Sequence, residues 1–510
     1  MRNWREQRSL LIVIAIGAVL RLINLGGRPL WYDEAFSMLY ARLPYDAMLQ
    51  GTLAQAQGAA ADVHPLFYYS TLHTWLQVFG DSPAGARWLS LVFSVGTIGL
   101  AYALMRELFD RRVGLMAALF LALSPFQIAY GQEARMYAQL GFWGAATLWA
   151  FVRGARTNSW KAWLAFGLCG AALLYSHNLA FAFLAALGLF VVARFVMGLA
   201  RRVLRTALLT GAITGGLIMG ALFSPWLSQL PAQFSRIAQA YWVPPPTGAT
   251  FVQTLIAFGF WTDNQAAPPL LAAALLAGSI LLVALIAHEL VQRRREFDAR
   301  VGLLVTLLFV PILVLVVISY ALKPIYLIRG LMPSQLAFLL LAAWATAKLP
   351  RVVQVGSAAL LGAILFFALV AHYTYTDFPR ALWDAITAYL RSNAIAGDAI
   401  VHDNKLSFFP MHVVDPDLPQ VYLPDVTGIG SDTLAPATQQ ALGLPATPSA
   451  EALANRGRVW LVIFSRARDD YRAAGFDDDP NWTAIAARYD MLEREVYGAV
   501  EVILWMRDGS

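Results

Sequence analysis

Two adjacent carboxylates, Asp33 and Glu34, follow the first long apolar stretch of the chain and come directly after Trp31 and Tyr32. Neighbouring carboxylates repel each other, so one member of such a pair is expected to act as a base near neutral pH. Consecutive side chains on a helix point about 100° apart, so we expect one acid to reach a substrate while the other holds structure. The alternative is that both only stabilise the first turn of a helix beginning near Ala35.

A second group of polar residues, Glu133, Arg135 and Tyr137, follows a Ser-Pro-Phe sequence at residues 124–126. We expect this group where a span reaches the outer surface. Ionisable groups at membrane depth are costly, so those at the outer rim are candidates for a functional site. In the functional interpretation Glu133 or Arg135 faces the same cavity as Asp33. The alternative is an ion pair within the loop that only caps the following span.

A third group consists of Lys323, Tyr326 and Arg329. Two cations beside a tyrosine at a membrane surface suit a phosphate that is anchored there by its lipid. Arginine can hold a phosphate through two parallel charged hydrogen bonds, whereas lysine acts as a point charge. The alternative is that both cations only reach toward lipid headgroups.

His64 begins a Pro- and Tyr-containing segment in the first outer loop and can hydrogen-bond a substrate, although a lone histidine is more often structural. Asp33, Glu133 and His64 also offer oxygen and imidazole ligands for a divalent metal, but their spacing specifies no metal site. The single cysteine, Cys169, lies in an apolar run, which excludes a disulfide within the chain and a thiolate metal cluster.

Composition places these groups in a membrane protein. The chain of 510 residues is 58% hydrophobic and 14% charged, whereas soluble domains carry about 25% charged residues. A bilayer core demands about 20 apolar helical residues per span. We expect eleven spans, at residues 9–26, 84–106, 112–130, 137–153, 160–177, 179–198, 206–228, 268–291, 301–321, 330–347 and 353–372.

The distribution of basic residues predicts the orientation of these spans. With the N-terminus in the cytoplasm, the cytoplasmic connections hold most of the arginines and lysines up to residue 372. The net charge of +6 follows from this bias and requires no nucleic acid. We therefore expect a multi-pass protein of the cell membrane, with its C-terminal domain outside the cytoplasm. The strong preference for arginine over lysine indicates a bacterial source.

We expect two domains, a membrane domain at residues 1–372 and a small α/β domain at residues 373–510. In the first outer loop, residues 34–49 and 65–79 have the pattern of helices that lie in the membrane interface. In the second domain we expect a helix at residues 378–392 and strands at 399–402, 459–464 and 500–506. Residues 416–449 are expected to form a long surface loop.

Taken in order, the motifs resemble those of the GT-C class of membrane glycosyltransferases, family 39-like, which includes protein O-mannosyltransferases and lipid A aminoarabinose transferases. The resemblance covers roughly residues 9–345. It rests on segments 30–35, 64–69, 79–82 with Arg87, 123–126 and 132–137, and on Tyr326, Arg329 and Pro333. Where the family usually has a second proline after the histidine, this chain has Leu66.

The resemblance implies a polyprenyl-phosphate sugar donor and a protein, lipid or glycan acceptor that approaches from outside the cytoplasm. It implies Asp33 as catalytic base, accompanied by Glu34, with Glu133 at the second acidic position. It implies that Arg329, with Lys323 and Arg135, binds the donor phosphate. His64, Tyr137 and Tyr326 are then expected to bind substrate. In-line attack on the sugar would invert its anomeric centre.

The alternative function is a transporter or flippase of lipid-linked glycans. Such proteins tend to have internal repeats and polar residues near the middle of the bilayer. This sequence shows no repeat, and its polar groups gather at one predicted face, which favours the enzyme.

Overall fold

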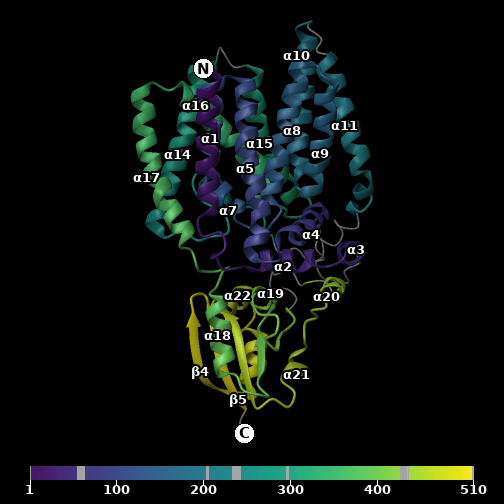
Figure 1. Ribbon diagram of the computed structural model, residues 1–510, viewed down its shortest axis with the longest axis vertical. Helices are drawn as coiled ribbons and strands as arrows, with labels where there is room; N and C mark the ends of the chain where they lie inside the picture. The colour runs from purple at the N-terminus through teal and green to yellow at the C-terminus, as the bar shows by residue number, and fades with distance from the viewer. Residues whose placement is uncertain are drawn as a thin grey trace.

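The computed structural model describes residues 2–53, 64–202, 206–231, 243–294, 298–425, 434 and 436–507. A layer of long helices forms one part of the elongated molecule, and a smaller α/β unit lies at one end of it (Figure 1). We call that end of the helical layer the sheet end. The N-terminus lies at the opposite end.

Each of the eleven ranges expected to span the membrane contains a helix. These helices are α1 (Arg2–Leu22), α5 (Pro83–Leu108), α6 (Arg111–Leu123) with α7 (Pro125–Gly131), α8 (Tyr137–Thr157), α9 (Trp160–Ser176), α10 (Ala180–Ala200), α11 (Thr206–Leu227), α14 (Pro269–Gln292), α15 (Ala299–Ala321), α16 (Met332–Lys348) and α17 (Arg351–Tyr373). By length and hydropathy, seven helices within the described residues can cross a membrane, or eight if α6 and α7 are one span. The count of eleven therefore stays a prediction.

The predicted span at 112–130 is broken, because α6 and α7 meet at an angle of 60°. Ser124 precedes Pro125, and a residue before proline is driven from helical into extended backbone. The Ser124 hydroxyl then caps α7 by accepting a hydrogen bond from the backbone N–H of Gln127. The break turns the chain that leads to Glu133 across the sheet end of the layer.

Three short helices line the sheet end: α2 (Tyr32–Ala41), α3 (Tyr45–Leu53) and α4 (Phe67–Phe79) (Figure 1). The 3-10 turn η2 (Ile328–Leu331) contacts α2 through Arg329 and Asp33, and α13 (Gly248–Gly259) contacts the segment before η2 through Thr254 and Tyr326. The expected helix at residues 34–49 is divided in two because Pro44 cannot continue a helix. The structure also buries most of α2, so this helix packs within the protein and does not lie on a lipid surface.

The C-terminal unit contains a five-stranded sheet in the order β2-β1-β3-β5-β4. Its strands are β1 (Ala399–His402), β2 (Gln420–Tyr422), β3 (Arg458–Phe464), β4 (Tyr489–Tyr497) and β5 (Val500–Arg507). Strands β1, β2 and β3 are parallel, and β3, β5 and β4 are antiparallel. The helices of the unit are α18 (Trp383–Asn393), α19 (Lys405–Val414), α20 (Pro436–Leu442), α21 (Ser449–Ala452), α22 (Ala467–Ala473) and α23 (Pro480–Ala486).

Three strands were expected from the sequence and are found, but β2 and β4 were missed. The segment at 416–449 is not one loop, since it contains β2 and α20. Strand β4 lies at the edge of the sheet, and its exposed charged residues hide the apolar alternation that marks a half-buried strand. The expected helix at 378–392 begins later, at Trp383.

The two parts of the molecule are packed together through α2 and α19. The ring of Phe409 in α19 stacks on Tyr32, with ring centroids 5.6 Å apart, and also stacks on Phe36. The Trp383 indole donates a hydrogen bond of 2.7 Å to the carbonyl of Leu30. The segment that carries Asp33 and Glu34 therefore lies between the helical layer and the α/β unit.

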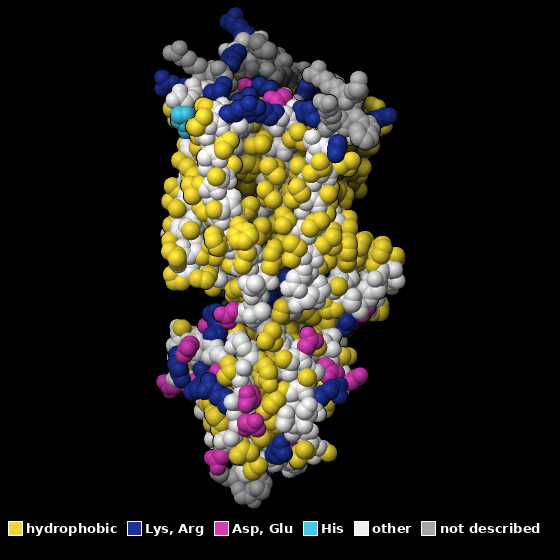
Figure 2. All heavy atoms as spheres, turned by 60° about the vertical axis from the view of Figure 1, so that its left-hand side comes forward, with side chains coloured by type: hydrophobic (Ala, Val, Ile, Leu, Met, Phe, Trp, Pro, Cys, Tyr) yellow, Lys and Arg dark blue, Asp and Glu magenta, His cyan; other side chains and the backbone are white. Residues whose placement is uncertain are grey.

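The surface of the molecule follows this division. Figure 2 shows hydrophobic side chains over the sides of the helical layer, and Lys and Arg side chains gathered at the end away from the α/β unit. The α/β unit carries charges of both signs. The apolar sides fit a bilayer, in agreement with the spans expected from composition.

Candidate active site

Asp33 lies in the first turn of α2, and its side chain is 17% exposed. The residue before this helix, Trp31, has extended backbone and makes no side-chain cap. An Asp33 carboxylate oxygen is 3.7 Å from Nε of Arg135 and 3.6 Å from Nη2 of Arg329. The structure thus brings together one acid and two cations from three distant stretches of the sequence.

Arg329 is positioned by the turn η2, which immediately precedes helix α16, a helix that is buried except for Lys348. Its Nε donates a hydrogen bond of 2.8 Å to the Tyr137 hydroxyl. Its guanidinium also lies over the rings of Trp31 and Tyr137, 5.6 Å from each centroid. Aromatic faces attract a cation, so they hold this group beside Asp33.

Arg135 approaches Asp33 from the loop before α8. Its Nη1 donates to the Ser37 hydroxyl at 3.0 Å and to the Tyr69 hydroxyl and the Asp33 carbonyl at 3.4 Å. The same loop is fixed to the end of α1 because Gln132 donates to the carbonyls of Arg21 and Ile23. The alternative of an ion pair between Arg135 and Glu133 is not what the structure shows, because Arg135 pairs with Asp33 and Glu133 pairs with Arg380.

Glu34 is fully buried, and both of its carboxylate oxygens accept hydrogen bonds. Nε of Arg87 donates to Oε1 at 2.7 Å, and Nη2 of Arg87 donates to Oε2 at 2.9 Å. Arg380 donates to Oε2 at 2.7 Å, and the amide of Ala134 donates to Oε1 at 3.1 Å. Asp33 and Glu34 therefore have separate surroundings, as their helical spacing predicts.

The pKa of Glu34 contradicts the expected effect of its neighbour. Burial raises this pKa, but Arg87 and Arg380 outweigh burial and bring it down to about 2. Glu34 is therefore a charged structural group at neutral pH. The prediction that repulsion within the pair would produce a base near neutrality is wrong for this residue.

Glu133 is the acid with a pKa near neutrality. Burial and the charge of Glu34 raise the pKa of Glu133 to about 7, against the opposing effect of Arg380 and Arg329. Its carboxylate accepts a hydrogen bond of 3.1 Å from Asn264 and lies 3.7 Å from Nη2 of Arg380. The charged groups that act on Glu133 include Asp33 and Arg329. We call this group of charged side chains the acidic cluster.

His64 lies beside a second imidazole, with its ring centroid 4.7 Å from that of His177. Burial, followed by repulsion from Arg135 and Arg329, lowers the pKa of His64 to about 3. His64 is therefore neutral at physiological pH. It can exchange a hydrogen bond with a substrate, but it does not supply positive charge.

The remaining predicted residues lie toward α13 and α15. The Tyr326 hydroxyl is buried and shares a hydrogen bond of 3.0 Å with Thr254 of α13. Lys323 lies half-buried in the loop between α15 and η2. A role of either residue toward the substrate stays a prediction.

Two residues of the cluster were missed by sequence reasoning. Asn264 comes from the loop between α13 and α14, and Arg380 comes from the segment after α17, which was assigned to the second domain. The available signal for Arg380 was a basic residue shortly after the last span, on the side where basic residues are scarce.

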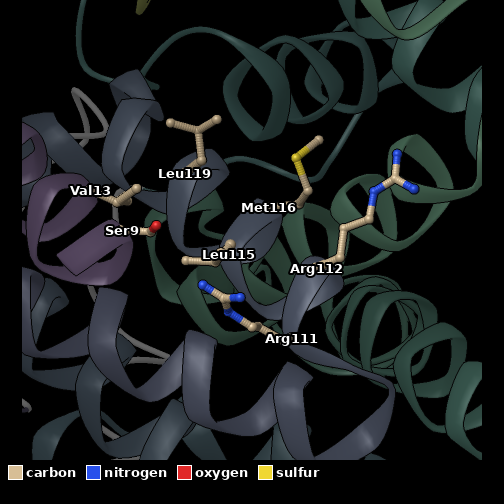
Figure 3. Close-up of a pocket in the computed structure, with 7 residues that line it drawn as sticks. All are labelled: Ser9, Val13, Arg111, Arg112, Leu115, Met116 and Leu119. Atoms are coloured by element: carbon tan, nitrogen blue, oxygen red, sulfur yellow. The ribbon is translucent and has the colours of Figure 1, made fainter. Parts of the chain in front are cut away.

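No group of three His, Cys, Asp or Glu side chains within the described part of the chain is arranged to hold a metal ion. A groove with a volume of about 400 Å³ lies between α1 and α6, and no residue of the acidic cluster lines it (Figure 3). It is lined by Ser9, Val13, Arg111, Arg112, Leu115, Met116 and Leu119. These residues come from within α1 and α6, whereas Asp33 and Glu133 follow the ends of α1 and α7.

Comparison with known proteins agrees with the fold. Residues 63–228 match the family described as dolichyl-phosphate-mannose-protein mannosyltransferase. No curated protein matches the chain. ArnT from Cupriavidus metallidurans in the apo state is similar at a TM-score of 0.60 and 13% identity, covering 97% of each chain.

Two further structures with similar folds contain lipid phosphates. ArnT bound to undecaprenyl phosphate aligns at a TM-score of 0.58 and 14% identity, again over 97% of each chain. The oligosaccharyltransferase AglB from Archaeoglobus fulgidus, in complex with an inhibitory peptide and a dolichol-phosphate, aligns at 0.58 and 12% identity. That alignment covers 100% of this chain and 77% of AglB. The resemblance drawn from the motifs is confirmed: this chain has the GT-C glycosyltransferase fold.

Proposed function

We propose that this protein transfers a sugar from a polyprenyl-phosphate carrier to an acceptor hydroxyl on the extracytoplasmic side of the membrane. The observation that carries the proposal is the placement of Asp33. Its carboxylate is partly exposed and lies between Arg135 and Arg329, whereas the neighbouring Glu34 is buried and engaged. A carboxylate base and two cations that can stabilise an anionic leaving group therefore lie side by side.

Arg329, assisted by Arg135, binds the donor phosphate in this mechanism. Both guanidiniums are 3.6–3.7 Å from the Asp33 carboxylate, which is longer than a tight charged hydrogen bond of about 2.7–2.9 Å. A phosphate can therefore compete for these donors without displacing a close ion pair. Positive charge stabilises the phosphate as it departs, so no proton is needed on the leaving oxygen.

Asp33 removes the proton from the acceptor hydroxyl. The acceptor oxygen forms a bond to the anomeric carbon, and the bond from that carbon to the phosphate oxygen breaks. Its electron pair leaves with the phosphate, and the acceptor proton remains on Asp33. In-line displacement of this kind inverts the anomeric centre. An ionised Glu133 stabilises positive charge that develops on the sugar, as carboxylates do in glycoside chemistry.

The donor class is supported by the similar structures that contain undecaprenyl phosphate and dolichol-phosphate. The outward placement of the site is supported by Figure 2, since basic side chains gather at the opposite end of the helical layer. A transporter is less consistent with the structure, because the charged cluster lies at one end of the layer and not at mid-depth.

The test measures sugar transfer by the purified full-length protein from undecaprenyl-phosphate-linked mannose, arabinose and glucose. General bases contribute about 10²- to 10⁴-fold, so Asp33→Asn is expected to reduce kcat by that factor with donor binding retained. Asp81→Asn is the matched control, because Asp81 forms an exposed ion pair with Arg42. Unchanged turnover in Asp33→Asn would remove Asp33 as the base.

A further inference from the structure

Arg380 belongs to the segment that joins the last long helix to the α/β unit, yet its side chain enters the acidic cluster. Its guanidinium is 1% exposed and donates to the carbonyl of Pro29 as well as to Glu34. The same segment is tied to the helical layer, because the Tyr375 hydroxyl accepts a hydrogen bond of 3.3 Å from the backbone amide of Ala266 and the Trp383 indole donates to the carbonyl of Leu30. The position of Arg380 is therefore set by the docking of this segment.

Arg380 lies between the two buried acids. Its Nη1 is 2.7 Å from Oε2 of Glu34, and its Nη2 is 3.7 Å from Oε2 of Glu133. Arg87 already forms two charged hydrogen bonds to Glu34. Arg380 therefore adds to the effect of Arg87 on Glu34 and also forms an ion pair with Glu133.

We propose that Arg380 is a positioning residue of the transfer reaction, which holds Glu133 as an oriented carboxylate beside Asp33 and so makes docking of the C-terminal segment a condition of activity. This inference rests on the proposed function. Its physical basis is the position of one guanidinium between two buried carboxylates, 2.7 Å from Glu34 and 3.7 Å from Glu133. Without Arg380, Glu133 loses the cation that lies 3.7 Å from its carboxylate.

The affected acid is Glu133, because Glu34 keeps Arg87. Burial and Glu34 both favour the protonated form of Glu133, and Arg380 is the first of the groups that oppose them. The other charged or titratable groups that act on Glu133, or on which it acts, are Asp33, Arg329, Arg28, Tyr68, Tyr130 and Tyr137. Loss of Arg380 therefore raises the pH needed to ionise Glu133.

The experiment compares Arg380→Gln, Arg380→Lys and the parent protein by kcat and donor KM across pH. We expect Arg380→Gln to lower kcat at neutral pH by about tenfold for each unit by which the pKa of Glu133 rises, with recovery at higher pH. Donor KM should change little, because Arg380 contacts Pro29, Glu34 and Glu133, whereas the phosphate is assigned to Arg329 and Arg135. Arg380→Lys keeps the charge and should restore most of the parent pH profile.

Arg87→Gln is the matched control for a purely structural role. Arg87 is equally buried and binds the same Glu34, so its loss should destabilise the fold in a similar way, which thermal unfolding would record. We expect Arg87→Gln to leave the acid limb of the pH profile in place. Equal shifts in both variants, or a loss in Arg380→Gln that is the same at every pH, would overturn the proposal.

A second readout does not depend on activity. The infrared band of the protonated Glu133 carboxyl, identified by its disappearance in Glu133→Gln, can be titrated in parent protein and Arg380→Gln. The proposal requires this band to persist to higher pH in Arg380→Gln, and an unchanged titration refutes it. If the parent protein transfers no sugar from any donor, the proposed function fails, whereas the infrared titration still decides whether Arg380 keeps Glu133 ionised.

Discussion

Asp33 and Arg329 come from opposite ends of the membrane domain in sequence, yet the Asp33 carboxylate and Nη2 of Arg329 are 3.6 Å apart. The contact requires α2 and η2 to meet at the sheet end of the helical layer. Nε of Arg329 also donates a hydrogen bond of 2.8 Å to the Tyr137 hydroxyl, which fixes the guanidinium. A partly exposed carboxylate thus faces a cation whose position is fixed by other groups. This arrangement suits a carboxylate base that acts beside a bound anion.

Replacement of Arg329 by lysine is expected to weaken donor binding. Lysine keeps one positive charge but cannot form two parallel hydrogen bonds or span the rings of Trp31 and Tyr137. Loss of one charged hydrogen bond costs about 1.5–3 kcal/mol, so the dissociation constant of undecaprenyl phosphate should rise about tenfold or more. Calorimetric titration measures this, with Arg391→Gln on the surface ion pair to Asp415 as control. Unchanged affinity would remove Arg329 from the phosphate site.

Removal of the charge on Glu34 is expected to destabilise the protein. Glu34→Gln leaves Arg87 and Arg380 buried without their carboxylate, and breaking such a pair costs about 3–5 kcal/mol. Thermal unfolding in detergent should show a clear fall in Tm, compared with little change for the exposed acid in Asp81→Asn. An unchanged Tm would contradict the structural role assigned to Glu34.

The low pKa of Glu34 predicts that the folded protein loses stability in acid. The pKa of Glu34 is about 2 in the folded protein, below its ordinary value of 4.5, because Arg87 and Arg380 outweigh the effect of burial. Its stabilising contribution is therefore complete above pH 4.5 and is lost as the pH falls toward 2. Unfolding measured across this range should show a smaller pH dependence in Glu34→Gln than in the parent protein. Equal dependence would contradict the assignment.

Glu133 predicts the pH dependence of activity. Burial and Glu34 raise its pKa to about 7, so the ionised form required by the mechanism appears as pH rises through that value. We expect kcat to have an acid limb near pH 7, and this limb should be absent from the residual activity of Glu133→Gln. The raised pKa also means that the contribution of Glu133 to folding stability is lost as pH rises from 4.5 to about 7. An acid limb that persists in the variant would assign it to another group.

His64 is expected to act without changing its charge. Its pKa is lowered to about 3 by burial and by Arg135 and Arg329. His64→Gln keeps a neutral hydrogen-bonding side chain, so the pH profile of kcat should keep its shape even if substrate affinity falls. Kinetics of this variant across pH provide the test. A lost or displaced limb would show that His64 carries a proton in the reaction.

The sequence by itself indicated the class of protein, the positions of its long helices and three residues, Asp33, Glu133 and Arg329, that the structure brings into one cluster. Apolar runs and basic loops are local patterns, so they could be recognised without a structure. The motifs around Asp33, Glu133 and Arg329 were found in the same way. Strand β4 was missed because its charged, exposed residues do not show the alternation of a half-buried strand.

The tertiary structure alone decided which charges are partners. Asp33 and Glu34 are equivalent in a local pattern, but packing leaves one partly exposed and surrounds the other with Arg87 and Arg380. Arg380 and Asn264 reach Glu133 from segments that were not assigned to the site from the sequence. The physical reason is that ion pairing and burial depend on distances between residues remote in sequence, which no helical or strand period encodes.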